Sequence, residues 1–221
     1  MMITDRPDPM LELPIADAHM RWALDAVEEV AGEKGMVVIL RQAGLEEFIG
    51  NYPSTQLLFT GRTFGEYAAL NRAILDFYGR AAGSFARRIG RVSAKNMIEQ
   101  QDDLLGLQQL ALRAMGTELR VKLGLMSSAR MFVNLYKRAG DMEVTHIVED
   151  QGDHFTYALK ECPCCAGLTA DRPICAMWLG VLYEGGLYVT GGKVFEYQEI
   201  ACRALGDEFC VFQVGKVAVN V

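Results

Sequence analysis

The distribution of cysteine is the feature that most constrains how this chain can fold. All six cysteines lie between Cys162 and Cys210, and the first 161 residues contain none. The opening residues lack the apolar region of a signal peptide, so we expect a cytoplasmic protein. In a reducing compartment, clustered cysteines are more often metal ligands or redox groups than disulfides. The sequence therefore predicts a C-terminal part organised by thiol chemistry.

The densest candidate group combines Cys175, Cys202 and Cys210 with the carboxylate of Glu199. Thiolates and carboxylates are ligands that zinc binds tetrahedrally, and four protein ligands leave no open position for a substrate. Glu199 is the uncertain member. A separation of three residues puts Glu199 and Cys202 on opposite faces of a regular strand, so both can bind one ion only if a bulge intervenes. The alternative is that these cysteines are small buried residues.

A second thiol group follows a predicted hairpin, in the run Cys162-Pro-Cys164-Cys165. Cys162 and Cys165 have the Cys-x-x-Cys spacing of zinc knuckles, thiol redox pairs and some iron–sulfur ligands. The alternative is a turn with incidental thiols. The sequence leaves this possible second site unassigned.

Hydrophobic periodicity predicts helices first and strands later. A helix begins at Asp17 and ends before Gly32 and Gly35. Thr63 and Glu66 form a possible capping box for a helix that reaches about Ile89. Further expected elements are a helical region over 103–137, a hairpin of 143–149 and 154–160, a helix from about Pro173 that ends at Gly185-Gly186, and strands over 194–203 and 208–214.

This order predicts an α+β fold, with helices packed on one face of a roughly four-stranded antiparallel sheet. Residues 1–16, with three of the six prolines, are expected to be an extended arm lying on the domain or on a partner chain. Residues 17–221 are expected to form a single domain, with a helical part over 17–140 and a metal-clasped sheet part over 141–221. An apolar fraction of 51% is sufficient for a core.

Charge and motifs exclude several functional classes. The 22 basic and 28 acidic residues give a net charge of −6, and no basic run is present, which argues against direct nucleic-acid binding. The longest uncharged apolar stretch, Pro173 to Tyr183, is too short to span a membrane. No Gly-x-Gly-x-x-Gly or Walker motif offers a site for a nucleotide cofactor.

The C-terminal residues resemble the signature of the vinyl-reductase (4-vinyl reductase) domain family. The resemblance rests on Pro173-Ile-Cys175, Gly180, Gly191-Gly192-Lys, Glu199-Ile-Ala-Cys202 and Gly206-Asp207-Glu-Phe-Cys210-Val-Phe. It is specific from about Cys175 to Phe212 and looser upstream. The family includes hydrocarbon-binding proteins and the sensor domains of phenol-responsive activators. It shares a fold with Golgi transport-particle subunits and haem-nitric-oxide sensor domains.

The resemblance implies one zinc ion held by Cys175, Glu199, Cys202 and Cys210. It also implies a hydrophobic-ligand pocket between helices and sheet, and a homodimer built through the N-terminal helices. Unlike the activators, this sequence carries no ATPase or DNA-binding segment, so it can sense or carry but not by itself activate transcription.

Aromatic residues on the elements around the metal are candidates for the pocket walls. Trp178 lies one helical turn after Cys175, and Tyr197 shares a strand face with Glu199. The opposite wall could come from Phe155 and Tyr157, or from Phe132 and Tyr136, with His146 as a polar group for a phenolic ligand. For each of these residues the alternative is plain core packing.

Three functions follow from these observations. We favour a zinc-containing binding or sensor protein for a small aromatic or hydrocarbon molecule, without catalysis. The alternatives are an enzyme or accessory factor of (bacterio)chlorophyll vinyl-group reduction, and a protein-interaction subunit like the transport-particle proteins. The sequence does not name the ligand.

Overall fold

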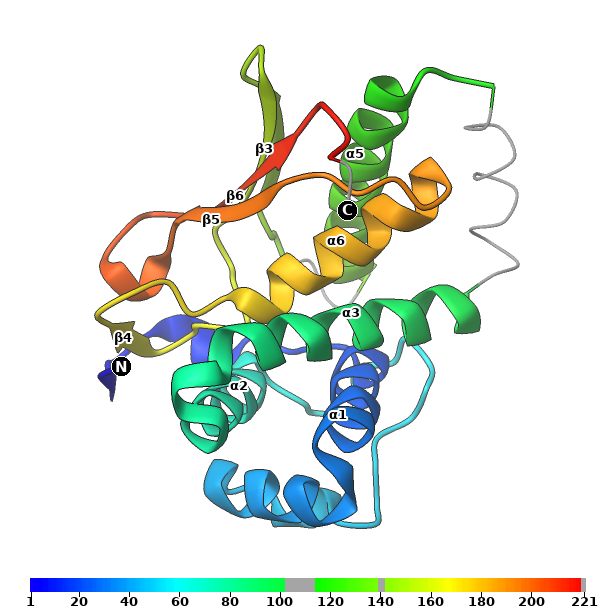
Figure 1. Ribbon diagram of the computed structural model, residues 1–221. Coiled ribbons are helices and arrows are strands. Elements are labelled where there is room, and N and C mark those ends of the chain that lie inside the picture. The colour runs from blue at the N-terminus through cyan, green and yellow to red at the C-terminus, as the bar shows by residue number, and fades with distance from the viewer. Residues whose placement is uncertain (102–113, 139–141, 220–221) are drawn as a thin grey trace.

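The computed structural model describes residues 1–101, 114–138 and 142–219 (Figure 1). The helices are α1 (Asp17–Ala43), α2 (Phe64–Tyr78), α3 (Ala82–Gln100), α5 (Thr117–Arg138) and α6 (Ala176–Thr190). Short 3-10 turns are η1 (Pro9–Glu12), η2 (Glu46–Phe48), η3 (Gly79–Ala81) and η4 (Arg203–Leu205). The strands are β1 (Ile3–Asp5), β2 (His146–Asp150), β3 (His154–Leu159), β4 (Leu168–Ala170), β5 (Tyr197–Ala201) and β6 (Cys210–Gly215).

Four of the strands form an antiparallel sheet in the order β2-β3-β6-β5. Alternate side chains of β3 and β6 face the core, because successive residues of a strand point to opposite faces. Tyr157 pairs with Phe212 and Phe155 pairs with Val214, and all four side chains are fully buried. The predicted α+β class and four-stranded antiparallel sheet are therefore confirmed.

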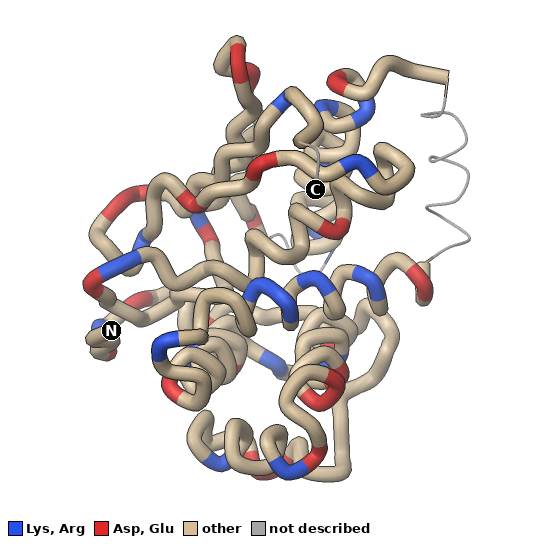
Figure 2. The backbone as a smooth tube through the Cα atoms, viewed as in Figure 1, with Lys and Arg blue, Asp and Glu red and all other residues tan. Residues whose placement is uncertain are grey.

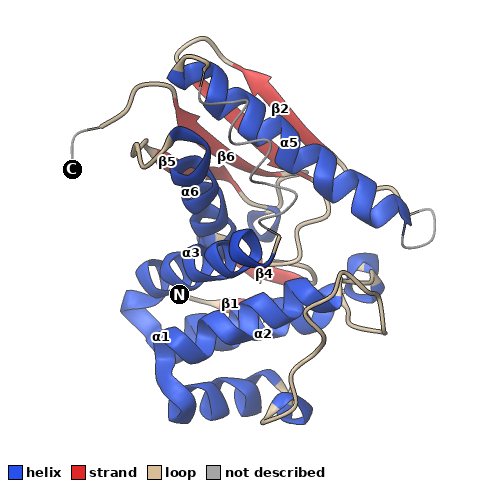
Figure 3. Ribbon diagram, turned by 90° about the vertical axis from the view of Figure 1, so that its right-hand side faces the viewer, coloured by secondary structure: helices blue, strands red, loops and turns tan. Residues whose placement is uncertain are grey.

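The helices lie in layers on one side of this sheet (Figure 3). Helices α5 and α6 contact the sheet directly, through β2 and β5 respectively. Helix α3 crosses α6, and α1 and α2 pack against α3 on its far side (Figure 1). Helix α6 thus joins the helical layers to the sheet, and its first turn enters the cysteine-rich region. Among the described residues, no helix is long and apolar enough to cross a membrane.

Two glycines allow α3 and α6 to cross at backbone contact. A Cβ on Gly90 would lie 1.9 Å from the carbonyl oxygen of Met177, and one on Gly180 would lie 2.1 Å from that of Arg87. Beside the crossing, Arg91 donates to Glu184 across 2.9 Å. Figure 2 shows several basic residues along α3, with acidic and basic residues intermixed over the rest of the chain. The glycines therefore fix the position of α6.

The N-terminal segment is tied to the cysteine-rich part of the chain. Strand β1 pairs antiparallel with β4, so that Ile3 lies opposite Ala170. The backbone N–H of Arg6 donates to the carbonyl of Gly167 across 2.8 Å. The expected arm over residues 1–16 therefore lies on the chain itself as part of a two-stranded sheet, which the sequence did not predict.

Three helix boundaries differ from those predicted. Helix α1 is interrupted at Gly32, whose φ of 72° is left-handed, but resumes and runs to Ala43. The predicted helix from Thr63 to Ile89 is divided at Gly79, whose φ of 53° and ψ of −113° are strained for any other residue. Helix α6 continues past Gly185 and Gly186 to Thr190. Gly186 serves packing instead, because a Cβ there would lie 1.9 Å from the hydroxyl of Tyr197.

Other local predictions are confirmed. The Thr63 side chain accepts from the Glu66 N–H while the Glu66 carboxylate accepts from the Thr63 N–H, which completes the capping box. The predicted hairpin is β2 and β3. Of the predicted helical region over 103–137, residues up to 113 lie outside the described part of the chain, and α5 accounts for the remainder from Thr117.

Candidate metal centre and cavity

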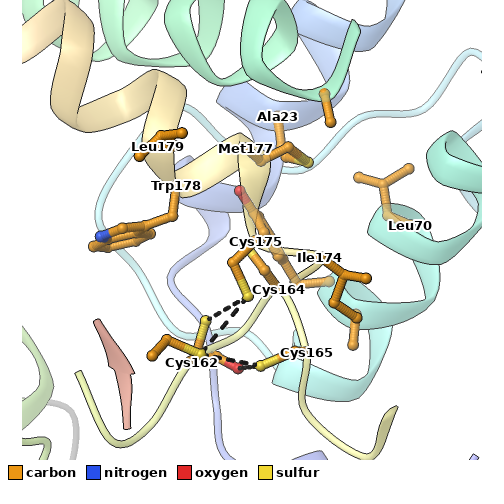
Figure 4. Packing of buried hydrophobic residues seen from close by; sticks show 14 of the residues in the cluster. Ala23, Leu70, Cys162, Cys164, Cys165, Ile174, Cys175, Met177, Trp178 and Leu179 are labelled. Atoms are coloured by element: carbon orange, nitrogen blue, oxygen red, sulfur yellow. Dashed lines mark hydrogen bonds between the residues drawn. The ribbon is translucent and has the colours of Figure 1, made fainter. Parts of the chain in front are cut away.

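All six cysteine side chains are buried and carry free thiols. They come from three places: the turn after β3, the residue that caps α6, and the two ends of the β5–β6 connection (Figure 4). The Cys175 Sγ lies 3.6 Å from that of Cys162, 3.8 Å from that of Cys202 and 3.7 Å from that of Cys210. Cys175 is therefore at the centre of the cluster.

One set of four ligands is the predicted one. The donor atoms of Cys175, Glu199, Cys202 and Cys210 all lie within 4.8 Å of one another. The bulge that this set requires is present, because the β5–β6 register shifts between Glu199 and Ala201. It turns the chain so that both Glu199 and Cys202 reach the cluster. The N–H of Cys202 donates to the Asp207 carboxylate across 2.8 Å, which holds the β5–β6 connection in place.

The Glu199 carboxyl lies in a setting that disfavours its charge. Its Oε2 accepts from the Cys175 N–H across 3.0 Å, while Oε1 is buried and has no hydrogen-bond partner among the described residues. Burial, reinforced by the neighbouring thiol of Cys202, raises the pKa of Glu199 to about 10. A cation bound by Oε1 would remove this penalty, so the orphaned oxygen fits a metal ligand.

A second set of four ligands consists of Cys162, Cys165, Cys175 and Cys210, whose donor atoms also lie within 4.8 Å of one another. The Cys165 Sγ lies 3.4 Å from the Cys210 Sγ. Hydrogen bonds from the thiol of Cys162 lower the pKa of Cys165 and of Cys210 to about 6, which favours the thiolate form that metals bind. The run that the sequence left unassigned thus joins the same cluster.

Cys164 belongs to neither set, although it is equally buried. Its carbonyl, and that of Ile174, accept from the side-chain amide of Asn71 across 2.8 and 3.0 Å. Asn71 therefore fastens both cysteine-bearing loops to α2. Sequence reasoning missed this residue, and its signal was a polar side chain on the buried stripe of an amphipathic helix.

The donors fit a tetrahedral thiophilic ion. At a Zn–S distance of about 2.3 Å, tetrahedral geometry puts neighbouring sulfurs about 3.8 Å apart. The measured Sγ–Sγ distances of 3.4 to 3.8 Å are close to this value. Thiolate ligands select zinc and other soft metals over magnesium or calcium. A buried cluster of thiols that could hold a metal is therefore present in the C-terminal part.

A cavity of about 270 Å³ lies between α3, α5, α6 and the sheet. Its lining is mostly apolar and includes four of the predicted pocket residues, namely Phe132, Tyr157, Trp178 and Tyr197. Helix α5 contributes Val121, Leu125 and Met131, and α6 contributes Val181, Leu182 and Val189. A cavity of about 150 Å³ can hold benzene, so this one has room for a substituted aromatic ring.

A smaller cavity of about 40 Å³ adjoins it and shares Met97, Phe132, Trp178 and Val181 as lining residues. Tyr136, predicted for the pocket, lines this smaller cavity together with His19 and His146. Phe155 lines neither of these two cavities, and the Lys216 ammonium lies 4.5 Å from its ring centroid.

Polar groups are few and concentrated where the two cavities meet. The His146 Nδ1 lies 2.7 Å from the Tyr157 hydroxyl, and its ring stacks on Phe132 at a centroid distance of 5.3 Å. Burial lowers the pKa of His146 to about 4, so its imidazole is neutral at neutral pH. The indole N–H of Trp178 is buried and has no hydrogen-bond partner in the described part of the chain. An unpaired buried donor fits a ligand that brings an acceptor.

Known proteins resemble this chain in one segment of sequence and in overall fold. Residues 155–216 match the 4-vinyl reductase domain. The matched segment contains all six cysteines and Glu199, and the match confirms the resemblance to vinyl-reductase domains over these residues. No curated protein matches the sequence.

The fold as a whole is similar to that of H-NOX proteins. A variant of the Tt H-NOX protein aligns at a TM-score of 0.57 and 14% identity, over 94% of this chain and 98% of that one. The H-NOX protein from K. algicida gives 0.55 and 16%, over 94% and 98%. An oxygen-binding H-NOX domain related to soluble guanylate cyclases gives 0.53 and 16%, over 90% and 94%. At these identities the similarity shows the fold alone.

Haem, a cofactor of the H-NOX family, does not fit the described residues. The lining of the 270 Å³ cavity includes no histidine. The two histidines that line a cavity, His19 and His146, border the one of about 40 Å³, which is far too small for a porphyrin. Because benzene alone needs about 150 Å³, a haem would require both cavities to open widely.

Proposed function

We propose that this chain binds a small aromatic molecule with a hydrogen-bond acceptor, as a sensor or carrier and without converting it. The match to the 4-vinyl reductase domain and the H-NOX-like fold support a small-molecule binding or sensor protein. The observation that carries the finer proposal is the apolar 270 Å³ cavity, with the unpaired Trp178 N–H at its wall. An apolar pocket with few polar groups is typical of small-molecule sites.

We further propose that a zinc ion bound by Cys175, Glu199, Cys202 and Cys210 holds the cavity in shape. Trp178 lies on the helix that Cys175 caps, and Tyr197 lies two residues before Glu199 on β5. An ion that joins these ligands would fix both aromatic walls. Four protein ligands leave no open position on the ion, so its role would be structural.

Calorimetric titration with phenol and toluene tests the proposed binding, because the two molecules differ in the acceptor. Both should bind to the wild-type protein. Replacing the Trp178 indole removes the unpaired N–H, so Trp178→Phe should weaken phenol binding about 5- to 10-fold, the value of one hydrogen bond, and leave toluene binding nearly unchanged.

Trp22→Phe is the matched control, because the Trp22 N–H already donates to Gln100 across 2.7 Å. This variant should not change the preference between the two ligands. Failure of both molecules to bind to the wild-type protein would contradict the proposal, as would equal weakening of both in Trp178→Phe. Turnover of a vinyl tetrapyrrole with added reductant would favour the enzyme alternative.

A further inference from the structure

The two ligand sets of the cysteine cluster share one edge. Cys175 and Cys210 belong to both sets, and their Sγ atoms lie 3.7 Å apart. Cys162 and Cys165 complete one set, while Glu199 and Cys202 complete the other. A thiolate sulfur can bridge two metal ions, so two shared thiolates with two further ligands on each side provide two four-coordinate positions.

The distances on the Cys162 side match those on the Glu199 side. The Cys162 Sγ lies 3.6 Å from that of Cys175, and the Cys165 Sγ lies 3.4 Å from that of Cys210. Across the shared edge, the Cys202 Sγ lies 3.8 Å from that of Cys175. Each is close to the about 3.8 Å expected for sulfurs on one tetrahedral zinc. In a cubane iron–sulfur cluster each thiolate binds a different iron, which would hold the sulfurs much further apart.

Charge does not prevent a second ion from entering. Each divalent ion that arrives neutralises the two thiolates that complete its coordination, so the second ion adds no net charge to the buried cluster. The protein supplies donors to the shared sulfurs as well. The N–H of Arg203 donates to the Cys210 Sγ across 3.4 Å, and Cys175 caps the N-terminus of α6, where the helix dipole favours an anion.

Backbone geometry places the Cys162 side of the cluster before any metal binds. The N–H of Cys165 donates to the carbonyl of Cys162 across 3.4 Å, which closes the turn of the Cys-x-x-Cys pair. The register of β3 with β6 puts Leu159 opposite Cys210, so the turn that follows β3 lies beside the start of β6. Spacing, turn and register thus agree on one position for a second ion.

We propose that the cluster binds two zinc ions bridged by the thiolates of Cys175 and Cys210, with Cys162 and Cys165 as the outer ligands of the second ion. This inference rests on the proposed zinc at Cys175, Glu199, Cys202 and Cys210. The second ion joins the turn after β3 to α6 and β6, so it secures the side of the cluster that the first ion does not reach.

Native mass spectrometry of the intact protein, expressed in zinc-supplemented medium, counts the ions. Two zinc ions per chain are expected for the wild type. Cys162→Ser and Cys165→Ser should each retain one. Cys164→Ser is the matched control, because it removes a buried thiol from the same turn but from neither ligand set, and it should retain two.

Cobalt-substituted protein gives a second measurement that does not depend on the variants. Two high-spin cobalt ions bridged by thiolates couple antiferromagnetically, so the EPR signal per cobalt should be much weaker in the fully loaded protein than in Cys162→Ser. A wild-type protein with one zinc that Cys162→Ser retains would overturn the second site alone. A wild-type protein with no zinc would overturn the first site as well.

Discussion

The crossing of α3 and α6 allows a quantitative test of how the metal centre and cavity are positioned. In Gly90→Ala the new Cβ would lie 1.9 Å from the carbonyl oxygen of Met177 and 2.7 Å from its carbonyl carbon. These are backbone atoms of a helix, so they cannot rotate away as a side chain could. Real Cβ contacts essentially never fall below 3.0 Å, so the two helices must separate by at least about 1 Å.

The expected cost follows from two opposing effects. Alanine gains about 1 kcal/mol of helix propensity over glycine. Overpacking a core contact costs about 1 to 3 kcal/mol, and a backbone clash belongs at the upper end of that range. The net loss is about 2 kcal/mol, which for a chain of this size lowers Tm by roughly 4 to 8 °C. Because Met177 is two residues from Cys175, zinc content should fall as well.

Thermal unfolding followed by circular dichroism, with elemental analysis of the same samples, measures both effects. Gly83→Ala is the matched control, since Gly83 lies in the same helix and a Cβ there meets nothing within 4 Å. It should stabilise the protein slightly or leave Tm unchanged. If Gly90→Ala unfolds at the same temperature as Gly83→Ala with full zinc content, the crossing does not position α6 as argued.

Three further predictions follow. Cys210→Ala should lose metal by elemental analysis and lower the free energy of unfolding by several kcal/mol, because Cys210 belongs to both ligand sets, whereas Cys164→Ala should keep its metal. Burial lowers the pKa of His19 to about 4, so the stability due to its neutral form is complete above about pH 6.5 and is lost as the pH falls towards 4. In denaturant titrations, His19→Phe should therefore lose about 1 to 2 kcal/mol less than wild type between about pH 7 and pH 5, and equal losses would refute this. We also propose a homodimer through the helical part, for which light scattering at micromolar concentration should give twice the chain mass, and a monomer would count against it.

Local signals in the sequence were sufficient for several elements. Period-two alternation on either side of Gln151-Gly152 predicted the hairpin of β2 and β3, because alternation fixes which face of a strand is buried. Thr63 and Glu66 predicted a helix start, because the capping box is a contact between residues three apart. The spacing of the cysteines with Glu199 predicted one complete ligand set, including the bulge that it requires.

Glycine misled the sequence analysis where its role depended on distant neighbours. Gly186 was expected to end a helix, but it lies inside α6 and makes room for the hydroxyl of Tyr197. Gly79 was expected inside a helix, but it separates α2 from α3 with a conformation that favours glycine. A glycine that ends a helix and one that permits close packing have the same side chain, so only the surroundings distinguish them.

The sequence by itself determined the α+β class, the four strands of the main sheet and the ligand set of Cys175, Glu199, Cys202 and Cys210. It could do so because strand alternation, capping and cysteine spacing are short-range patterns. Only the tertiary structure decided that the Cys162 turn joins the same cluster. That convergence depends on the pairing of Leu159 with Cys210, a register set by burying the inner faces of β3 and β6 together. Such a contact between distant residues leaves no periodic trace in the chain.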